Sequence, residues 1–409
     1  MDNRKIIIIG AGASGLIAAA KAAQRGLDVT LLEKNSRPAR KVMITGKGRC
    51  NVTNACFDIN ELISNVPRNP RFLYSAFSAF MPYDTIALFE ELGVQTKIER
   101  GNRVFPVSDK AVDIVDALVK YAKQSGATFM NATARSLEIE NGSVKAVMLE
   151  NGERLECDAL AICTGGKSYP QTGSSGDGYA LARQAGHSVT GLKPSLVPLI
   201  CSNNFISSLQ GLSLKNVSVK LFDSEKLVYS DFGEMLFTHF GISGPVVLSA
   251  SAHMKKPKEK HYKLSIDLKP ALDEKALDKR IQRDFEENKN RDFINSLSKL
   301  LPNKIIPTVV KLSKIEPSAK CNSITREQRL NLVSLLKNFS VDITDFRPID
   351  EAVITSGGVD VKEIDPKTMK SKIVDNLSFA GEIIDVDAYT GGFNLQIAFS
   401  TGFVCGESI

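Results

Sequence analysis

The chain has 409 residues, of which 43% are hydrophobic and 24% charged, a balance typical of a folded globular protein. This length predicts two or three domains, and no apolar run reaches the roughly 18 residues of a membrane-spanning helix, so we expect a cytoplasmic protein with no membrane partner. The net charge of +6 permits contact with nucleic acid but does not require it.

The N-terminus carries a dinucleotide-binding fingerprint. Residues 5–9 are apolar and predict a buried parallel strand, and residues 16–25 predict a helix. Gly10, Gly12 and Gly15 between them have the G-x-G-x-x-G spacing. These glycines allow a tight turn, close approach of a pyrophosphate to the backbone, and close packing of the helix on the strand. The N-terminus of the helix offers free N–H groups to the phosphates.

A second predicted strand, residues 29–33, ends in Glu33, about 20 residues beyond the glycines. A carboxylate at this position accepts hydrogen bonds from an adenosine ribose. We predict that the unit binds a dinucleotide; the alternative is a glycine turn in an ordinary α/β domain.

The next part of the chain adds a second glycine-bearing segment. Residues 40–54 combine glycines, arginines, lysines and asparagines, which predicts a cradle for an anion or a ring; the alternative is an exposed basic loop.

Residues 61–125 are mostly helical in pattern, with an amphipathic helix over 111–124. Residues 127–139 and 143–149 alternate like strands of a hairpin.

A predicted buried strand, residues 159–164, ends in Thr164, Gly165 and Gly166. Bare backbone is thereby brought to the carboxyl edge of the sheet, where α/β folds bind ligands. Asp177 is expected to cap the helix that follows, residues 179–185.

After residue 191 the pattern changes. Residues 195–268 contain short alternating runs and predict a β-rich insertion, whereas residues 271–340 have helical period. The basic stretch 253–263 is interpreted as a solvated hairpin turn, with a nucleic-acid patch as the alternative. We predict an α/β fold class in which one α/β domain is split in sequence by β-rich and helical segments.

The third glycine-bearing segment lies near the C-terminus. Gly381 and Glu382 follow a strand, and a glycine pair with amide side chains precedes the small-residue helix 397–405. The arrangement suits a polyhydroxyl chain and a ring with carbonyl and N–H edges. A protein that binds only NAD has no use for such a second loop.

These segments together resemble FAD-dependent oxidoreductases of the glutathione-reductase type, and more specifically the YhiN/BaiN-type flavoproteins. The closer likeness rests on residues 46–54, 233–245, 355–359, 366–369 and 391–396. It covers essentially the whole chain. Two residues depart from the family pattern, Ala39 and Lys47, because the family usually has glycine at both positions.

The resemblance implies tightly bound FAD in a Rossmann-like domain, with barrel-like and helical insertions. The implied bounds are 1–192 and 350–409 for the FAD-binding domain, 193–270 and 340–349 for the β-rich domain, and 271–339 for the helical domain.

It also implies contacts on the adenosine side of FAD. Residues 10–15 would hold the pyrophosphate and Glu33 the ribose. Arg40 and Lys41 would lie by the AMP or the pyrophosphate, and backbone near Arg135 would meet the adenine.

On the flavin side, residues 46–51 would line the ring, and residues 164–166 would pass behind the dinucleotide. Glu382 would meet the ribityl or pyrophosphate side, and residues 392–396 the isoalloxazine edge. The full set of expected cofactor contacts is Gly10, Gly12, Ala13, Ser14, Gly15, Glu33, Lys34, Arg40, Lys41, Gly46, Gly48, Arg49, Cys50, Asn51, Arg135, Thr164, Gly165, Gly166, Gly381, Glu382, Gly392, Phe393, Asn394, Leu395 and Gln396.

The implied function is an FAD-dependent oxidoreductase with hydride transfer at flavin N5 and a small organic substrate. Family members are associated with reduction of a C=C bond in steroid-type acids, for which NAD(P)H is a donor, and with amine oxidation, which uses O₂. Because only one G-x-G-x-x-G is visible at a strand–helix junction, any NAD(P)H would bind transiently. The alternatives are a flavin amine oxidase, a fumarate-reductase-like flavoprotein and an RNA-modifying or RNA-binding flavoprotein.

Two residues are candidates for catalysis. Arg49 could stabilise the anionic reduced flavin at N1 or bind phosphate only. His239 could donate a proton to the substrate or be a structural histidine. His187, just past a helix end, is expected to interact with the helix dipole.

The seven cysteines and four histidines show no C-x-x-C or H-x-x-x-H pair, so we expect a reducing compartment and no metal site. Cys50 and Cys56 are separated by five residues rather than by the four of the flavin disulfide reductases. The spacing disfavours a redox disulfide.

Overall fold

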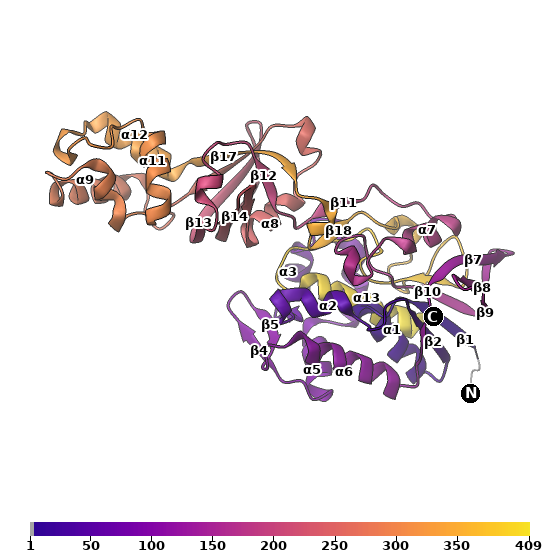
Figure 1. Ribbon diagram of the computed structural model, residues 1–409. Coiled ribbons are helices and arrows are strands. Elements are labelled where there is room, and N and C mark those ends of the chain that lie inside the picture. The colour runs from indigo at the N-terminus through magenta and orange to yellow at the C-terminus, as the bar shows by residue number, and fades with distance from the viewer. Residues whose placement is uncertain (1–3) are drawn as a thin grey trace. The chain divides into compact units, whose positions relative to one another are not determined.

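The computed structural model describes residues 4–409, which form two compact units (Figure 1). Unit 1 comprises the chain up to Ser195 together with Pro348–Ile409, and unit 2 comprises Leu196–Arg347. No helix among the described residues is long and apolar enough to cross a membrane.

Unit 1 is built on a parallel five-stranded sheet with the strand order β19-β10-β1-β2-β6. The strands are β1 (Lys5–Ile9), β2 (Asp28–Glu33), β6 (Thr128–Asn131), β10 (Ala159–Ile162) and β19 (Leu377–Phe379). The four isoleucines of β1 are at most 6% exposed, because a central parallel strand is covered on both faces.

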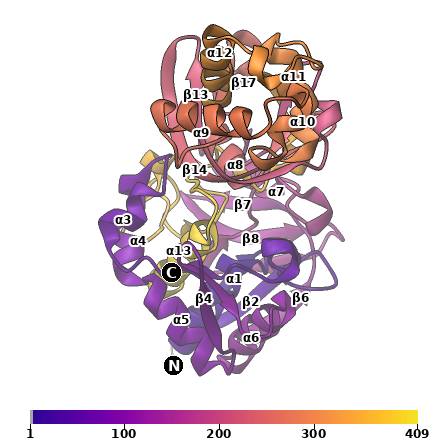
Figure 2. The same cartoon turned by 90° about the vertical axis from the view of Figure 1, so that its left-hand side faces the viewer.

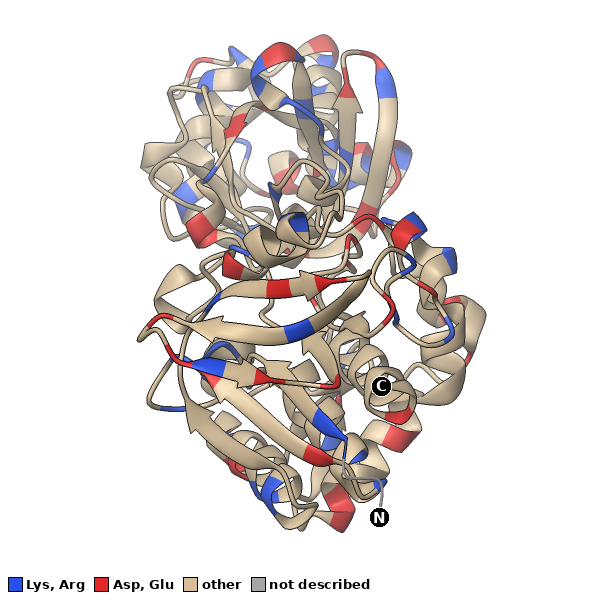
Figure 3. Cartoon of the chain, turned by 90° about the vertical axis from the view of Figure 1, so that its right-hand side faces the viewer, with Lys and Arg blue, Asp and Glu red and all other residues tan. Residues whose placement is uncertain are grey.

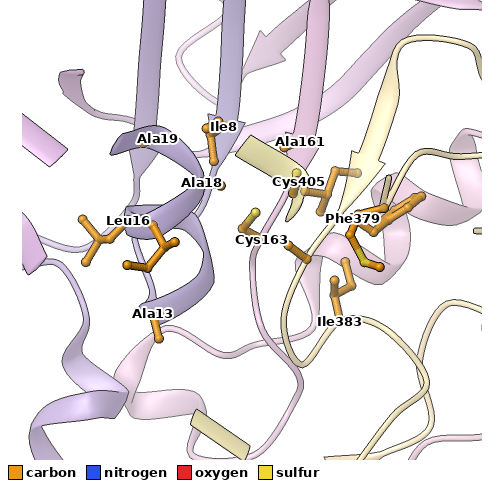
Figure 4. Close-up of a cluster of buried hydrophobic side chains, with 14 of the residues drawn as sticks. Ile8, Ala13, Leu16, Ala18, Ala19, Ala161, Cys163, Phe379, Ile383 and Cys405 are labelled. Atoms are coloured by element: carbon orange, nitrogen blue, oxygen red, sulfur yellow. The ribbon is translucent and has the colours of Figure 1, made fainter. Parts of the chain in front are cut away.

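The two terminal helices, α1 (Ala13–Gln24) and α13 (Phe393–Ser408), pack against each other beside this sheet. Their small residues allow close contact: a Cβ at Gly402 would lie 2.4 Å from the carbonyl oxygen of Ser14. The adjacent core contains Ile8, Leu16 and Phe379 (Figure 4).

Three smaller sheets complete unit 1. The strands are β3 (Thr53–Asn54), β5 (Arg103–Pro106) and β4 (Thr96–Glu99); β7 (Ala134–Glu140), β8 (Ser143–Leu149) and β9 (Arg154–Glu156); and the pair β11 (Lys193–Ser195) and β18 (Ile354–Ser356). Its other helices are α2 (Arg40–Ile44), α3 (Ile59–Ser64), α4 (Tyr74–Ala79), α5 (Pro82–Glu91), α6 (Ala111–Gln124) and α7 (Asp177–Gln184).

Unit 2 contains a closed six-stranded barrel with its own apolar core. In barrel order the strands are β12 (Leu199–Cys201), β15 (Gly241–Ser243), β14 (Lys226–Phe237), β13 (Ser213–Asp223), β16 (Tyr262–Asp267) and β17 (Phe339–Phe346). α8 (Pro245–Ala252) contacts β14. A separate group of helices lies together in Figures 1 and 2: α9 (Glu274–Glu287), α10 (Phe293–Ser296), α11 (Ile306–Ser313) and α12 (Arg326–Lys337).

The predicted α/β fold class is confirmed, as is the helix over 111–124. The predicted hairpin across residues 141–142 is confirmed as β7 and β8. Its first strand starts at Ala134 rather than at residue 127, because residues 128–131 form β6 of the central sheet. Two further local predictions are wrong. Residues 253–263 connect α8 to β16 rather than turning a hairpin, and Asp177 lies inside the first turn of α7, whose N-cap is Gly176.

Both residues that replace a family glycine have left-handed backbone, with φ of 53° at Ala39 and 61° at Lys47. A left-handed conformation costs a non-glycine residue about 1–2 kcal/mol, because its Cβ approaches the following carbonyl oxygen. The chain therefore retains the backbone of a glycine loop without the glycines.

We expect Lys47→Gly to raise the free energy of unfolding by about 0.5–1 kcal/mol, since the relief of strain exceeds the added entropy of the unfolded chain. Urea denaturation measures the change. Lys110→Gly is the control, because this exposed lysine has φ of −121° and should gain nothing. Equal effects of both substitutions would contradict the strain argument.

Candidate functional site

A cavity in unit 1 opens at the carboxyl ends of β1, β2 and β10, where a parallel sheet binds its ligand. It brings together 13 of the residues expected to contact the cofactor. These are Gly10, Gly12, Ala13, Ser14, Glu33, Lys34, Arg40, Lys41, Thr164, Gly165, Glu382, Asn394 and Leu395.

The N-terminus of α1 faces this cavity without a side-chain cap, and its N-cap residue is Gly12. The first turn contains no acidic residue, so its free N–H groups and positive dipole end are available to an anion. Gly10 has φ of 101°, and a Cβ there would lie 2.7 Å from the carbonyl oxygen of Cys163. Only glycine fits this turn.

Glu33 ends β2 beside that helix N-terminus. One carboxylate oxygen accepts a hydrogen bond from the backbone N–H of Ala11 at 3.0 Å. The other accepts from the backbone N–H and the side-chain amide of Asn35, at 2.8 and 2.7 Å. These contacts fix the carboxylate at the rim of the cavity, and its remaining lone pairs can accept hydroxyl groups.

A polar network crosses the cavity wall and joins segments that are distant in sequence. Lys41 Nζ lies 2.7 Å from a carboxylate oxygen of Glu382 and 2.7 Å from Ser168 Oγ. Glu382 also accepts from the backbone N–H of Thr355, whose hydroxyl accepts from the N–H groups of Lys167 and Ser168. The network therefore joins α2 to the loop after β10, to strand β18 and to the segment after β19.

Lys34 forms an ion pair with Asp177 and a hydrogen bond with Ser175 in the same cavity wall. Thr164 Oγ1 is buried and has no hydrogen-bond partner among the described residues. An uncapped helix N-terminus, an anchored carboxylate and a free buried hydroxyl are groups that a dinucleotide with a pyrophosphate and ribose hydroxyls requires. The residues present thus fit FAD.

The other 12 expected contacts do not line the cavity, and several have structural roles. A Cβ at Gly15 would lie 1.9 Å from the carbonyl oxygen of Gly10, so this glycine serves helix–strand packing. Ala132, Thr133 and Ala134 line the cavity in place of their neighbour Arg135. The remaining residues outside the lining are Gly46, Gly48, Arg49, Cys50, Asn51, Gly166, Gly381, Gly392, Phe393 and Gln396.

Arg49 is directed to an acidic pair instead of the cavity. Its guanidinium lies 2.5 Å from Glu99 and 2.5 Å from Asp109, and it stacks over Phe105 with 4.1 Å to the ring centroid. Hydrogen bonds from Arg49 lower the pKa of the Glu99 carboxyl. In the structure, the Arg49 guanidinium therefore holds together Glu99, Asp109 and Phe105 and does not line the cavity.

The candidate His239 lies in unit 2, where it is exposed and contacts Phe240 edge-on. The predicted dipole role of His187 is wrong. Its side chain is fully buried between Glu363 and Ser371, at 3.1 and 2.7 Å. Burial lowers the pKa of this imidazole, which favours the neutral form over the cation that a helix C-terminus attracts.

Gln396 is fully hydrogen-bonded within the protein. Its Oε1 accepts from Thr53 Oγ1 at 2.6 Å and Thr85 Oγ1 at 2.8 Å. Its Nε2 donates to the carbonyl oxygen of Phe80 at 3.0 Å and to Ser400 Oγ at 2.9 Å. The amide has no further donor or acceptor to spare for a flavin edge.

We expect Gln396→Leu to destabilise the FAD-free protein by about 2–4 kcal/mol, because three buried hydroxyls and a carbonyl each lose a hydrogen-bond partner. Urea denaturation of protein stripped of FAD checks this. The control is Gln95→Leu, an exposed glutamine whose side chain has no hydrogen bond among the described residues, so no loss is expected. A Gln396 variant that is stable but has lost FAD would instead indicate a flavin contact.

Cys50 and Cys56 are both buried free thiols. Burial raises the pKa of Cys50 to about 12 and that of Cys56 to about 11. Both thiols are therefore protonated near neutral pH, where a reactive cysteine requires a thiolate.

We expect Cys56→Ala to retain flavin and turnover, and iodoacetamide to label neither cysteine in the native protein between pH 7 and 9. Mass spectrometry of the native and the urea-unfolded protein gives the comparison. Rapid native labelling at Cys56, together with lost turnover in Cys56→Ala, would indicate a redox cysteine.

Some lining residues were not among the expected contacts. Asn35, Thr172, Gly173 and Ser174 line the cavity. Their position in the loops after β2 and β10 was the available signal, because loops at the carboxyl edge of the sheet meet there. Thr45 also lines the cavity and lies in the predicted cradle over residues 40–54.

A parallel Rossmann-like sheet with this cavity at its carboxyl edge defines a dinucleotide-binding protein. The family model described as HI0933-like protein Rossmann domain matches residues 4–408, so the chain belongs to this family. The resemblance to YhiN/BaiN-type flavoproteins is thereby confirmed, and the protein is an FAD-dependent oxidoreductase.

Two curated relatives are similar over their full length. A 3-dehydro-bile acid delta(4,6)-reductase of Clostridium scindens is 30% identical over 410 residues, which cover 99% of this chain and 98% of that protein. A ribosomal RNA dihydrouridine synthase of Escherichia coli is 31% identical over 409 residues, with coverage of 100% and 98%.

Among solved structures, the 3-ketosteroid delta1-dehydrogenase of Sterolibacterium denitrificans, in complex with 1,4-androstadiene-3,17-dione, has a TM-score of 0.52. The match covers 99% of each chain at 13% identity, and it is a likeness of fold alone.

Proposed function

We propose that the protein reduces a carbon–carbon double bond conjugated to a carbonyl group, with NAD(P)H as the electron donor. The observation that carries this proposal is the pair of full-length relatives named after two such reductions. A 3-oxo bile acid with 4,6 double bonds and the uracil ring of uridine share one reactive unit. At the 4,5 bond of the steroid and the 5,6 bond of uracil, a hydride adds to the carbon β to the carbonyl and a proton adds to the α carbon. At the 6,7 bond of the steroid diene, the conjugation extends the same polarity, so the hydride adds to the δ carbon and the proton to the γ carbon.

Bound FAD would supply the hydride at N5. The chain's own residues would position the cofactor. The free N–H groups at the start of α1 would bind the pyrophosphate, and Glu33 would accept from the adenosine ribose. Backbone of residues 132–134 would meet the adenine, and the Thr164 hydroxyl would gain a partner.

Lys41 and Glu382 would contact the central part of the dinucleotide, between the pyrophosphate and the ribityl chain. Their ion pair leaves this wall nearly neutral, and side-chain exposures of 22% and 14% keep most of both groups from water. An ammonium fixed in this way can bind a phosphate or ribityl oxygen without rearrangement, and that preorganisation favours tight retention of FAD.

The nature of the acceptor has two candidates. A steroid-type acid is suggested by the bile acid reductase, and uracil in RNA by the dihydrouridine synthase. The charge of unit 2 favours RNA, since residues 196–347 contain 24 lysines and arginines against 17 acids. Amine oxidation with O₂ is the alternative reaction, and the rapid-mixing experiment below distinguishes it from reduction of either acceptor.

We expect Glu33→Ala to weaken FAD binding about 10- to 100-fold, because a charged acceptor of ribose hydroxyls contributes about 1.5–3 kcal/mol. Titration of stripped protein with FAD, followed by flavin fluorescence, measures the affinity. The matched control is the exposed Glu150→Ala, which should bind normally. Unchanged affinity in Glu33→Ala would remove this residue from the site.

The reaction is tested by anaerobic rapid mixing of the yellow holoenzyme with NADH or NADPH. Fast bleaching, followed by reoxidation with a 3-oxo-4,6-diene bile acid or a uridine-containing RNA, supports the proposal. No bleaching by either nucleotide, together with air-dependent turnover of an amine, would overturn it.

A further inference from the structure

The basic excess of the chain is confined to unit 2. Residues 196–347 contain 24 lysines and arginines and 17 aspartates and glutamates, a net charge of +7. The rest of the chain contains 28 and 29, a net charge of −1. Positive charge is therefore a property of the insertion rather than of the cofactor-binding unit.

The most basic segment by sequence, 253–263, is only partly neutralised in the fold. Lys256 lies 2.9 Å from Glu259, and Lys258 lies 3.1 Å from Asp345. Lys260 is paired with Asp223. Three of its five lysines therefore have acidic partners within unit 2, whereas the exposed Lys255 and Lys263 have no ion pair among the described residues.

Helix α9 carries a row of three exposed basic side chains without acidic partners among the described residues. Lys275, Lys279 and Arg283 are exposed, and their i, i+4, i+8 spacing aligns them on one face of the helix. Among the residues that the structure describes, no salt bridge involves any of the three within 4.0 Å. We call these three residues the α9 stripe.

Most acids of α9 form ion pairs with basic residues other than those of the α9 stripe. Asp284 pairs with Arg280, Glu286 with Lys289 and Glu287 with Lys299. Asp278 pairs with Arg329 of α12.

Only Glu274, at the start of the helix, lacks an ion pair among the acids of α9 as described. Like charges four residues apart destabilise a helix by about 0.2–0.5 kcal/mol per pair. The two like-charge spacings of the α9 stripe therefore lower helix stability, and Glu286 and Glu287, three and four residues after Arg283, offset part of that cost.

The hydrogen bond from Arg329 and, to a smaller extent, the charge of the exposed Arg326 at the start of α12 lower the pKa of the Asp278 carboxyl on α9. The opposite face of α9 is buried through Leu277, Ile281 and Phe285. Figure 3 marks the lysines and arginines in blue and the aspartates and glutamates in red, and both colours occur throughout the chain.

We propose that the α9 stripe binds the phosphate backbone of RNA. The charges recur about every 6 Å along the helix, as a row of separate cations suited to successive phosphates. Insertion into a lipid surface needs a free apolar face, which α9 buries in its own core. The choice of RNA among polyanions rests on the proposed function, because uracil is one of its two acceptors.

The test measures binding of the full-length holoenzyme to a fluorescein-labelled, uridine-containing single-stranded RNA of 30 nucleotides, by anisotropy over a range of salt. Lys275→Gln, Lys279→Gln and Arg283→Gln are combined in one variant, because glutamine preserves helix propensity. The control combines Lys120→Gln, Lys145→Gln and Lys367→Gln, exposed residues of unit 1 with the same total charge change.

We expect the α9 variant to lose at least about tenfold in affinity and its log–log salt slope to fall by about 2–3, with the control unchanged. Equal losses in both variants, no loss in the α9 variant, or no RNA binding by the wild type would each overturn the proposal. So would a stripe-dependent binding to phosphatidylserine vesicles that exceeds the binding to RNA.

Flavin reduction by NAD(P)H and turnover of the small bile acid substrate are measured in the same variants. Both should be unchanged, since the stripe lies outside the cofactor-binding unit. Failure of the wild type to be reduced would count against the proposed function and leave the RNA result to be judged on its own.

Discussion

The site depends on how closely the backbone of α1 can approach its neighbours. Gly15 lets α1 lie on the turn at Gly10, and Gly402 lets α13 lie on the carbonyl oxygen of Ser14. A methyl group at either glycine would clash with backbone, which cannot move aside as a flexible side chain could. Because these contacts fix the helix, its uncapped N-terminus points at the carboxyl edge of the sheet, where a pyrophosphate can use it.

The remaining wall of the cavity is held by polar contacts between segments far apart in the chain. Glu382 joins Lys41 of α2 to Ser168 and Thr355, so one carboxylate fixes the loop after β10 and strand β18. Such a network is stable only when each member is satisfied. The two left-handed residues of the loop around α2 show that this backbone is retained even where the family's glycines are replaced.

Much of this arrangement follows from sequence because its signals are local. The strand, glycines, helix, second strand and Glu33 occur within about 30 residues, and each element constrains the next. The barrel strands were harder to delimit, since short alternating runs do not specify which partner they pair with. The lysines of 253–263 were the most visible basic cluster, yet three of them have acidic partners in the fold.

The sequence by itself determined the fold class, the dinucleotide fingerprint and the family, because these depend on periodicity and on spacing between near neighbours. Only the tertiary structure decided which polar side chains are free to act. The Gln396 amide is hydrogen-bonded to Thr53, 343 residues away, and the Arg49 guanidinium to Glu99, 50 residues away. The α9 stripe is conspicuous only because the acids around it are paired elsewhere. A polar residue's role depends on the partners that folding brings to it, and their distance along the chain hides them from any local pattern.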